Sequence, residues 1–373
     1  MKPFSQLLAQ YQADIEVENS DKSQGLSRAE SELIDASVRI KSDPPSPNDF
    51  TFMHSIMCQV GLPRSRVNGS EFERRCGAAG LYIRAGKIWD GKQFLQQPVP
   101  YGPMPRLVMA YLNTQALRSK SPEIDVGNSA SAFLKQLGKE SSGGKNGSYT
   151  NFRKQLLALS ACSITLGFST ADKAFTYDGK PIQKFEAWIG NSDNQGALWP
   201  GVITFSHEYF TTLSEHAVPL DLRALNQLNS SALAMDIYAM LSDRLHRISG
   251  RPVVLYWRNL REQFGQEYTG DDADRNFKKV FLPALKRVLT VYPDAKVKKV
   301  TGGILMMSSP HRFHTVIDLI TGQCAGFFML LFCKVVENTV GFGFYPRIIA
   351  PLCTHNYPLT TDELRIITPT FHA

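Results

Sequence analysis

The sequence lacks any long apolar segment. Its longest uncharged apolar run, residues 324–333, has ten residues, whereas a helix that spans a bilayer needs about 20. Charged residues lie close to this run on both sides, and the N-terminal MKPFSQLLAQYQ contains none of the apolar core of a signal peptide. We therefore expect a cytoplasmic protein that has no membrane role.

Cysteine and recognisable metal ligands are also scarce. The six cysteines form no CxxC pair, which favours reduced thiols over a disulfide or zinc framework. His311 and His314 could share a helical face, but no further ligand pattern accompanies them. The sequence contains no phosphate loop ending in Gly-Lys-Ser or Gly-Lys-Thr, which argues against an ATP-driven motor. We expect no metal, no cofactor and no enzymatic activity.

Positive charge, by contrast, is in excess. The formal net charge is +7 and the isoelectric point is about 9.0. Residues 1–50 carry nine acids and five bases, a net of −4, so the remaining residues carry +11. A basic body of this kind points to a polyanionic partner. At 373 residues and 43% hydrophobic content, the chain is long enough for about two domains with real cores.

The most informative local pattern is the basic stretch 271–308. Its apolar residues recur at spacings of four, four and three, which places them on one face of a helix. The turn Thr301-Gly302-Gly303 then predicts a β-hairpin, because glycine accepts the positive φ that a tight turn needs. The residues between 275 and 299 include eight cations and one acid, Asp294. The apolar stripe consists of Phe277, Phe281, Leu285 and Val288.

A helix with a cationic face beside a basic hairpin is typical of a winged-helix domain that reads duplex DNA. A solvated, lysine-rich face on an ordinary α+β domain would show the same pattern, so the stretch alone leaves both interpretations open. In the same module the pattern predicts a helix capped by Ser230 or Ser231, a strand at 253–257 and a second helix at 258–264 closed by Gly265.

The same order of elements is predicted earlier in the chain. Helices are expected to begin at Pro105, at Ser129 and at a capping Ser148, with a short strand at 122–126 between the first two. Residues 163–168 and 184–189 are expected to pair as a hairpin. Helix, strand, helix, helix, hairpin is the winged-helix order, so we predict an α+β fold with two tandem winged-helix domains that join near 214–222.

The segments that precede the first module are predicted more coarsely. Residues 80–88 and 92–99 are expected to form strands joined by an Asp90-Gly91 turn. Residues 50–62 are apolar enough to be buried, but their pattern does not separate strand from helix. A capping box at Ser27 predicts a short helix after a polar arm.

Several of these segments resemble a known family. PYGPMPRLVMAYLNTQALRSKSPEIDVGNSASAFLKQLG (101–138) and NFRKQLLALSACSITLGF (151–168) are similar to the RepA-type plasmid replication initiators. HSIMCQVGLPRSR (54–66) and the segment 80–103 resemble the same family, so that the likeness covers roughly residues 50–309.

The resemblance implies a protein that binds repeated sites (iterons) in the duplex origin DNA of its own plasmid. Such a protein would help to open the origin and to recruit the host initiator and replicative helicase. It would also exist as a homodimer in equilibrium with the monomer, and it would repress its own gene. The positions expected to face DNA are Asn151, Arg153 and Lys154 in the first domain and Arg275, Lys278, Lys279, Lys286, Lys296, Lys298 and Lys299 in the second.

These positions are expected to differ in role. Asn151 and Arg153 are candidates for base contacts, because amide and guanidinium groups bond bidentately to adenine and guanine. Lys154, Lys296 and Lys298 are expected to be plain phosphate contacts or solvated surface residues.

Two other functions remain as alternatives. A transcriptional regulator with the same fold would need the same DNA surface without a role in replication. A strand-nicking initiator would need two histidines flanking one hydrophobic residue near a tyrosine. No pair among the eight histidines has that spacing, since His311-Arg-Phe-His314 is one residue too long.

We therefore expect four segments. Residues 1–49 form a flexible acidic arm with a short helix, 50–218 the first winged-helix domain with its preceding strands, and 219–310 the second. Residues 311–373 form an apolar C-terminal tail that is atypical of the family and holds three of the six cysteines. Removing this tail is expected to leave DNA binding intact and to improve solubility.

Overall fold

The computed structural model describes residues 27–126, 133–135, 137, 147–169, 174–188 and 199–309. All of them belong to one compact unit, Met1–Gly322. The predicted arm before Ser27, most of the helix predicted to begin at Ser129 and the predicted apolar tail lie outside the described residues. The fold is α+β, as predicted, and every strand pairing described is antiparallel.

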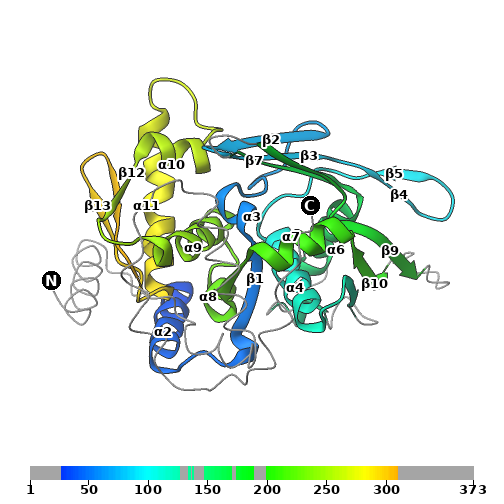
Figure 1. Cartoon of the computed structure of the whole chain (residues 1–373), viewed down its shortest axis with the longest axis horizontal. Coiled ribbons are helices and arrows are strands. Elements are labelled where there is room, and N and C mark those ends of the chain that lie inside the picture. The colour runs from blue at the N-terminus through cyan, green and yellow to red at the C-terminus, as the bar shows by residue number, and fades with distance from the viewer. Residues whose placement is uncertain are drawn as a thin grey trace, which may run out of the picture. The chain divides into compact units, whose positions relative to one another are not determined.

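The second predicted set of elements is confirmed. It consists of helix α9 (Ala232–Arg244), strand β12 (Val253–Tyr256), helix α10 (Trp257–Phe264), helix α11 (Ala273–Val291) and the hairpin β13 (Val297–Val300) and β14 (Gly303–Met306). Ser231, and not Ser230, caps α9, its hydroxyl accepting a hydrogen bond from the Ala234 amide. The three strands form a sheet in the order β12-β14-β13 (Figure 1).

The first set contains the same strand order. Helix α4 (Pro103–Ser119), strand β6 (Glu123–Asp125) and helix α6 (Ser148–Ala161) are present. Helix α4 begins two residues before the predicted Pro105, because Gly102 takes the cap position and Pro103 the first helical position. Strands β9 (Ile182–Trp188) and β10 (Trp199–Phe205) then complete a sheet in the order β6-β10-β9. In both sheets the earliest strand pairs with the last strand of the hairpin.

Two predictions in this set are wrong. Residues 163–168 do not pair with 184–189, because β7 (Ser163–Ser169) pairs with β8 (Ala174–Gly179) on one side and with β3 (Ala79–Arg84) on the other. The sequence pattern does not predict the intervening strand β8. Because β8 takes the edge of β7, β9 pairs with β10 instead. The second error is local: Ser148 is the first residue of α6, and Gly147 occupies the cap position without a side-chain hydrogen bond.

The strands that precede α4 form two small assemblies. Strand β2 (Glu71–Cys76) joins β3, β7 and β8 in a four-stranded sheet of order β2-β3-β7-β8. The predicted strand 80–88 is wrong as a single strand, because β3 ends at Arg84 and β4 (Lys87–Trp89) belongs to a different sheet. Strands β4 and β5 (Phe94–Gln96) form a separate hairpin around the predicted Asp90-Gly91 turn. In Figure 1 this hairpin extends away from the rest of the described elements.

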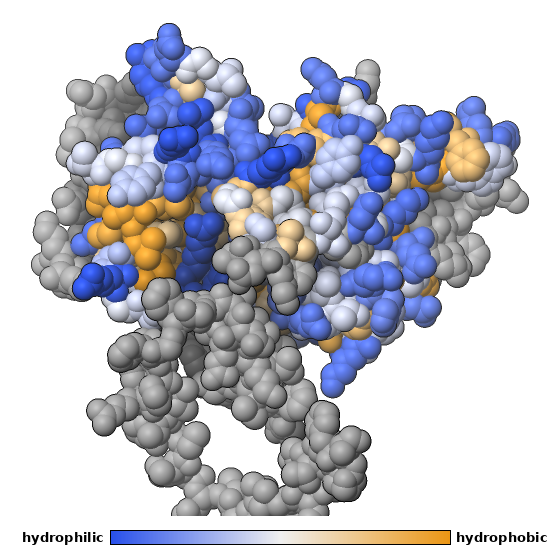
Figure 2. Space-filling model, turned by 45° about the horizontal axis from the view of Figure 1, so that its top comes forward, coloured by the Kyte–Doolittle hydropathy of each residue, from blue (hydrophilic) through white to orange (hydrophobic). Residues whose placement is uncertain are grey.

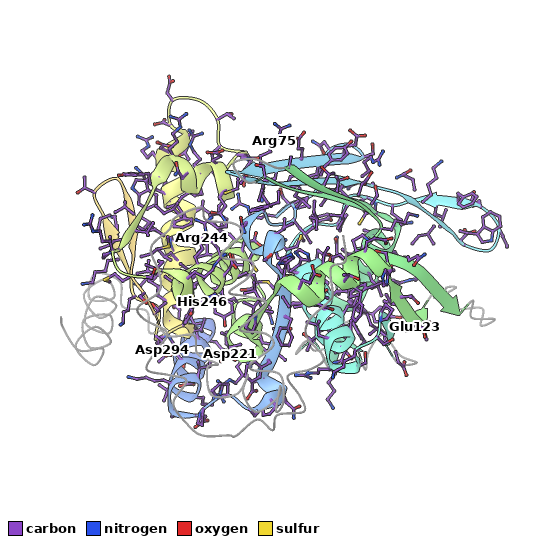
Figure 3. All side chains as sticks on the ribbon, in the orientation of Figure 1. Arg75, Glu123, Asp221, Arg244, His246 and Asp294 are labelled. Atoms are coloured by element: carbon purple, nitrogen blue, oxygen red, sulfur yellow. The ribbon has the colours of Figure 1, made fainter. Side chains whose placement is uncertain are left out.

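The apolar segment 50–62 contains both a strand and a helix. Strand β1 (Phe50–His54), preceded by the short helix η1 (Pro47–Asp49), pairs with β11 (Ala217–Asp221), and α3 (Ser55–Gln59) follows at once. Helix α7 (His207–His216) leads into β11, and α8 (Leu222–Gln227) follows it. Asp221 (Figure 3) caps α8 and pairs with Arg223 at 2.8 Å. Helix α2 (Arg28–Ser42) has the predicted capping box and packs on α8 and α11.

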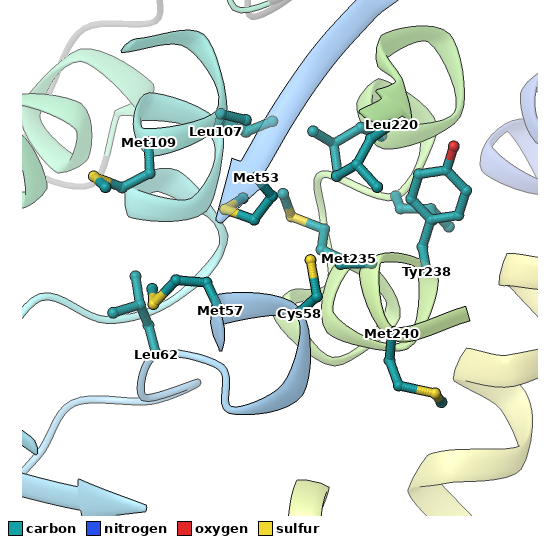
Figure 4. Packing of buried hydrophobic residues seen from close by; sticks show 14 of the residues in the cluster. Met53, Met57, Cys58, Leu62, Leu107, Met109, Leu220, Met235, Tyr238 and Met240 are labelled. Carbon is teal, nitrogen blue, oxygen red and sulfur yellow. The ribbon is translucent and has the colours of Figure 1, made fainter. Parts of the chain in front are cut away.

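Helix α9 lies at the centre of the hydrophobic core. Its residues 232–243 are all buried, and it contacts α3, α4, α11 and β11, with η2 (Leu245–Arg247) at its end. Figure 4 shows Met235 of α9 beside Met53 and Cys58, whereas Met240 projects from another side of the same helix. Methionine fills irregular gaps well, because its unbranched side chain has several rotatable bonds. The core is therefore continuous between the two sets of elements.

A buried ion pair joins the first helix of each set. The guanidinium of Arg106 on α4 binds the carboxylate of Asp236 on α9 through two hydrogen bonds, of 2.6 and 2.7 Å. Both side chains are less than a tenth exposed. The same guanidinium donates to the carbonyls of Leu62, Pro63 and Gly102. The predicted division of the chain near residue 218 stays a prediction.

Candidate nucleic-acid interface

Helix α11 carries the largest predicted basic set. Its predicted apolar stripe is confirmed, since Phe277, Phe281, Leu285 and Val288 are all buried. The end of α10 packs closely on this stripe: a Cβ at Gly265 would lie 2.5 Å from the Phe277 ring. Glycine at this position therefore lets α10 turn directly against α11. With its inner face fixed in this way, α11 presents the opposite face to solvent.

The cations of α11 do not share one environment. Arg275, Lys279 and Lys286 are exposed, whereas Lys278 is half-buried and its Nζ lies 5.1 Å from the centre of the Trp257 ring. This cation–π contact ties Lys278 to α10. Lys279 is one position further round the helix, beside the exposed Val280. Of the two adjacent lysines, Lys279 is therefore the more available to a partner.

The N-terminal end of α11 is acidic, whereas the sequence pattern predicts only the cationic residues that follow it. Asp272 precedes the first helical residue and lies 3.4 Å from Arg275. Asp274, in the first turn, lies 2.6 Å from Arg261 of α10. Carboxylates are favourable at a helix N-terminus because they offset the positive end of the helix dipole. Arg275 would have to exchange its carboxylate partner for a phosphate to contact DNA.

The C-terminal half of α11 lies against α2. Glu30 of α2 has its pKa lowered by hydrogen bonds from Ser27, and the charge of Lys286 lowers it further. Arg287 donates to the Ser230 hydroxyl at 2.9 Å and so ties α11 to the start of α9. Lys286 therefore faces a carboxylate of the same chain, unlike Lys279.

The hairpin β13–β14 holds the remaining lysines of this set. Lys296, Lys298 and Lys299 are all exposed. Because side chains alternate along a strand, Lys298 and Lys299 point to opposite faces of the sheet. Gly302 turns the hairpin with φ +91°, and Asp294 (Figure 3) precedes it. A single DNA duplex therefore cannot contact Lys298 and Lys299 equally, and each face of the hairpin carries positive charge.

The predicted residues of the first set lie on α6, which Figure 1 shows well apart from α11. Asn151 and Lys154 are exposed and stand three positions apart, so they share one face of the helix. Arg153 is only half-exposed, and Phe152 and Leu156 beside it lie in the core. The structure therefore presents two separate basic helices and does not gather all ten predicted residues into one site.

The described part of the chain holds no cluster of three or more His, Cys, Asp or Glu side chains able to bind a metal. No helix within it has the length and apolar content to cross a membrane. Cys58 and Cys162 are buried, free thiols, and burial raises the pKa of Cys162 to about 12.

These features define an α+β protein with two sets of elements of the same strand order, each holding a helix with cationic side chains. Residues 99–258 match the model of the family described as Plasmid encoded RepA protein. This confirms the resemblance to the RepA-type plasmid replication initiators for this part of the chain. The match supports a role in the initiation of plasmid replication.

The matched region is narrower than the resemblance, which extends over roughly 50–309. It begins just before α4 and ends in the first turn of α10. Helix α11 and the β13–β14 hairpin therefore lie beyond it. No curated protein and no solved structure matches the chain.

Proposed function

We propose that the chain acts in the cytoplasm as a sequence-specific duplex-DNA-binding initiator, which binds repeated origin sites through two winged-helix domains. In this proposal it helps to open the origin and to recruit the host initiator and replicative helicase. It also represses its own gene, as a dimer in equilibrium with the monomer. None of these steps requires the protein to act as an enzyme.

The observation that carries the proposal is the repeated strand order. The sheets β6-β10-β9 and β12-β14-β13 each combine one early strand with a later hairpin. Helix α11 directly precedes its hairpin, whereas strands β7 and β8 lie between α6 and β9. In a winged-helix domain the helix before the hairpin enters the major groove, and the hairpin lies along the backbone. The residues predicted to contact DNA lie on α6, on α11 and on or just before strand β13.

Within the second domain, the exposed face of α11 is the proposed reading surface. Asn276, Lys279, Val280 and Pro283 are exposed on it. An amide can bond bidentately to adenine, and an apolar side chain can contact the thymine methyl group. Lys279 and the hairpin lysines supply the phosphate contacts. Within the first domain, Asn151 and Arg153 would take the base contacts and Lys154 a phosphate.

The salt dependence of binding tests this assignment. If Lys279, Lys296 and Lys298 each neutralise one phosphate, the second domain alone contributes a slope of about −2.7 in a plot of log K against log salt. The variant Lys279→Glu should reduce the slope by at least about 1 and weaken binding to an origin duplex at least tenfold. Binding is measured by fluorescence anisotropy with the full chain.

Lys180→Glu is the matched control, because it makes the same charge change at an exposed residue between β8 and β9. Lys278 is left intact, since its contact with Trp257 would confound a binding loss with a packing defect. Equal effects of the two substitutions would show that net charge, and not the face of α11, governs binding. Salt-independent affinity in the wild type would refute the proposal altogether.

A further inference from the structure

The β4–β5 hairpin has no part in the interface proposed above, but it is firmly built. Asp90 accepts hydrogen bonds from the amides of Lys92 and Gln93, both at 2.8 Å, and Gly91 adopts φ +101° at the tip. At the base, the Gln97 amide donates to the Gly86 carbonyl at 2.9 Å. A Cβ at Gly86 would lie 2.0 Å from the carbonyl oxygen of Ala161, so the hairpin begins directly against the end of α6.

One face of this hairpin carries two solvent-exposed aromatic rings. Trp89 and Phe94 are directly paired across the strands, with ring centroids 5.1 Å apart and an interplanar angle of 57°. Trp89 is 52% exposed and Phe94 67% exposed. Phe94 is the most exposed large apolar side chain of the described residues, and contiguous exposed apolar groups mark binding sites more often than single ones do. Figure 2 shows the hairpin, at the right, as a small apolar area surrounded by hydrophilic residues.

Polar and cationic groups frame the rings. Lys87 and Gln96 are paired across the strands two positions from the rings, and so lie on the same face. Lys92 is exposed at the tip. In the described part of the chain, no carboxylate forms an ion pair with Lys87. The opposite face carries only Ile88 and Leu95.

We propose that this face, the aromatic platform formed by Lys87, Trp89, Lys92, Phe94 and Gln96, binds single-stranded nucleic acid by base stacking. The proposal rests on the proposed function, because an opened origin supplies such a strand. Every base has a π-face that stacks on an aromatic ring, and lysines beside the rings attract the adjoining phosphates. The rings supply stacking area without any requirement for base sequence.

The dimensions of the platform favour this ligand over a protein. A stable protein interface covers about 800 Å² on each partner and is depleted of charge at its centre. Here the apolar strip is two rings wide, and lysines and glutamines border it. A strand of bases needs only one ring for each stacked base, with a cation within reach of the backbone.

The test uses the full chain and a fluorescein-labelled oligothymidylate of about 16 nucleotides. Stacking contributes roughly a tenfold gain in affinity for each base. The variant Trp89→Ala/Phe94→Ala should therefore bind the probe at least tenfold more weakly than the wild type. Trp89→Phe/Phe94→Tyr keeps both rings and should bind nearly as well. Leu95→Ala is the matched control on the opposite face and should be without effect.

Binding to an origin duplex is measured on the same samples, and Trp89→Ala/Phe94→Ala should leave it unchanged. Equal binding of the oligothymidylate by this variant and the wild type would overturn the proposal, as would an equal loss in Leu95→Ala. A change in sedimentation coefficient without a change in oligonucleotide affinity would assign the platform to a second copy of the chain instead. Failure of the wild type to bind the duplex would count against the proposed function and not against the platform.

Discussion

The buried Arg106–Asp236 pair should contribute strongly to stability and hold the two sets of elements together. We consider the variant Arg106→Met, which retains much of the side-chain volume and removes the charge. It leaves the Asp236 carboxylate in the core without its cation, and it removes the donor from the carbonyls of Leu62, Pro63 and Gly102. Removing one partner of a buried pair costs about 3–5 kcal/mol, because an uncompensated charge remains.

A double-mutant cycle separates the pair from its surroundings. Asp236→Asn keeps the shape of the side chain. This shape matters because Gly61 packs directly on it: a Cβ at Gly61 would lie 2.6 Å from the carboxylate. The doubly substituted chain contains neither charge, so its loss of stability should be smaller than the sum of the single losses by up to about 3 kcal/mol. Stability is measured as the free energy of unfolding in urea, followed by circular dichroism.

Arg28→Ala is the control, because Arg28 and Glu32 form an exposed pair on one turn of α2. Exposed pairs of this kind contribute little, so this variant should unfold at the wild-type urea concentration. A loss below about 1 kcal/mol for Arg106→Met, or strict additivity in the cycle, would refute the reasoning. Either result would mean that the guanidinium reaches water in solution.

Two further predictions concern single positions. Gly303→Ala should destabilise the chain by about 1–3 kcal/mol and weaken duplex binding, because the added Cβ would lie 2.2 Å from the Leu255 carbonyl oxygen and would push β14 from β12. Gly80→Ala is the control, because a Cβ at Gly80 meets nothing within 4 Å. Equal melting temperatures for the two variants would contradict the prediction. Burial, together with the nearby His216, lowers the pKa of His54 to about 3, so between about pH 6.5 and 3 the unfolded chain binds one more proton than the folded chain and stability falls as pH falls. His54→Asn, which keeps an acceptor for the Ile56 amide, should remove about 2 kcal/mol of the stability loss between pH 7 and pH 5, and parallel pH curves for the two proteins would exclude this cause.

Most local structure could be predicted from the sequence where short-range physics decides it. The apolar stripe of α11, the capping residues Ser27 and Ser231 and the glycine turn at Gly302 each depend on neighbours within a few positions. Helical periodicity and cap chemistry act within such distances. The basic set on α11 and β13 could be located for the same reason.

Pairing between distant strands could not be predicted in the same way. Residues 163–169 alternate well enough to pair with several strands, and their partners β3 and β8 are chosen by long-range packing. The local environment of each cation could not be predicted from the sequence either. Sequence alone shows Lys278 and Lys279 as equivalent, yet only Lys278 packs against Trp257, and Lys286 lies near Glu30 of a helix more than two hundred positions earlier.

The sequence by itself thus determined the element types, the order of the second set of elements, the excess of positive charge and the likeness to RepA-type initiators. These depend on composition and on contacts close along the chain. Only the tertiary structure decided that both sheets share one strand order, that Arg106 meets Asp236 inside the core, and that Trp89 and Phe94 stand exposed on one face. The first two depend on contacts between segments that lie far apart in the chain. The third depends on whether any other segment covers the two rings, and burial is a property of the whole fold.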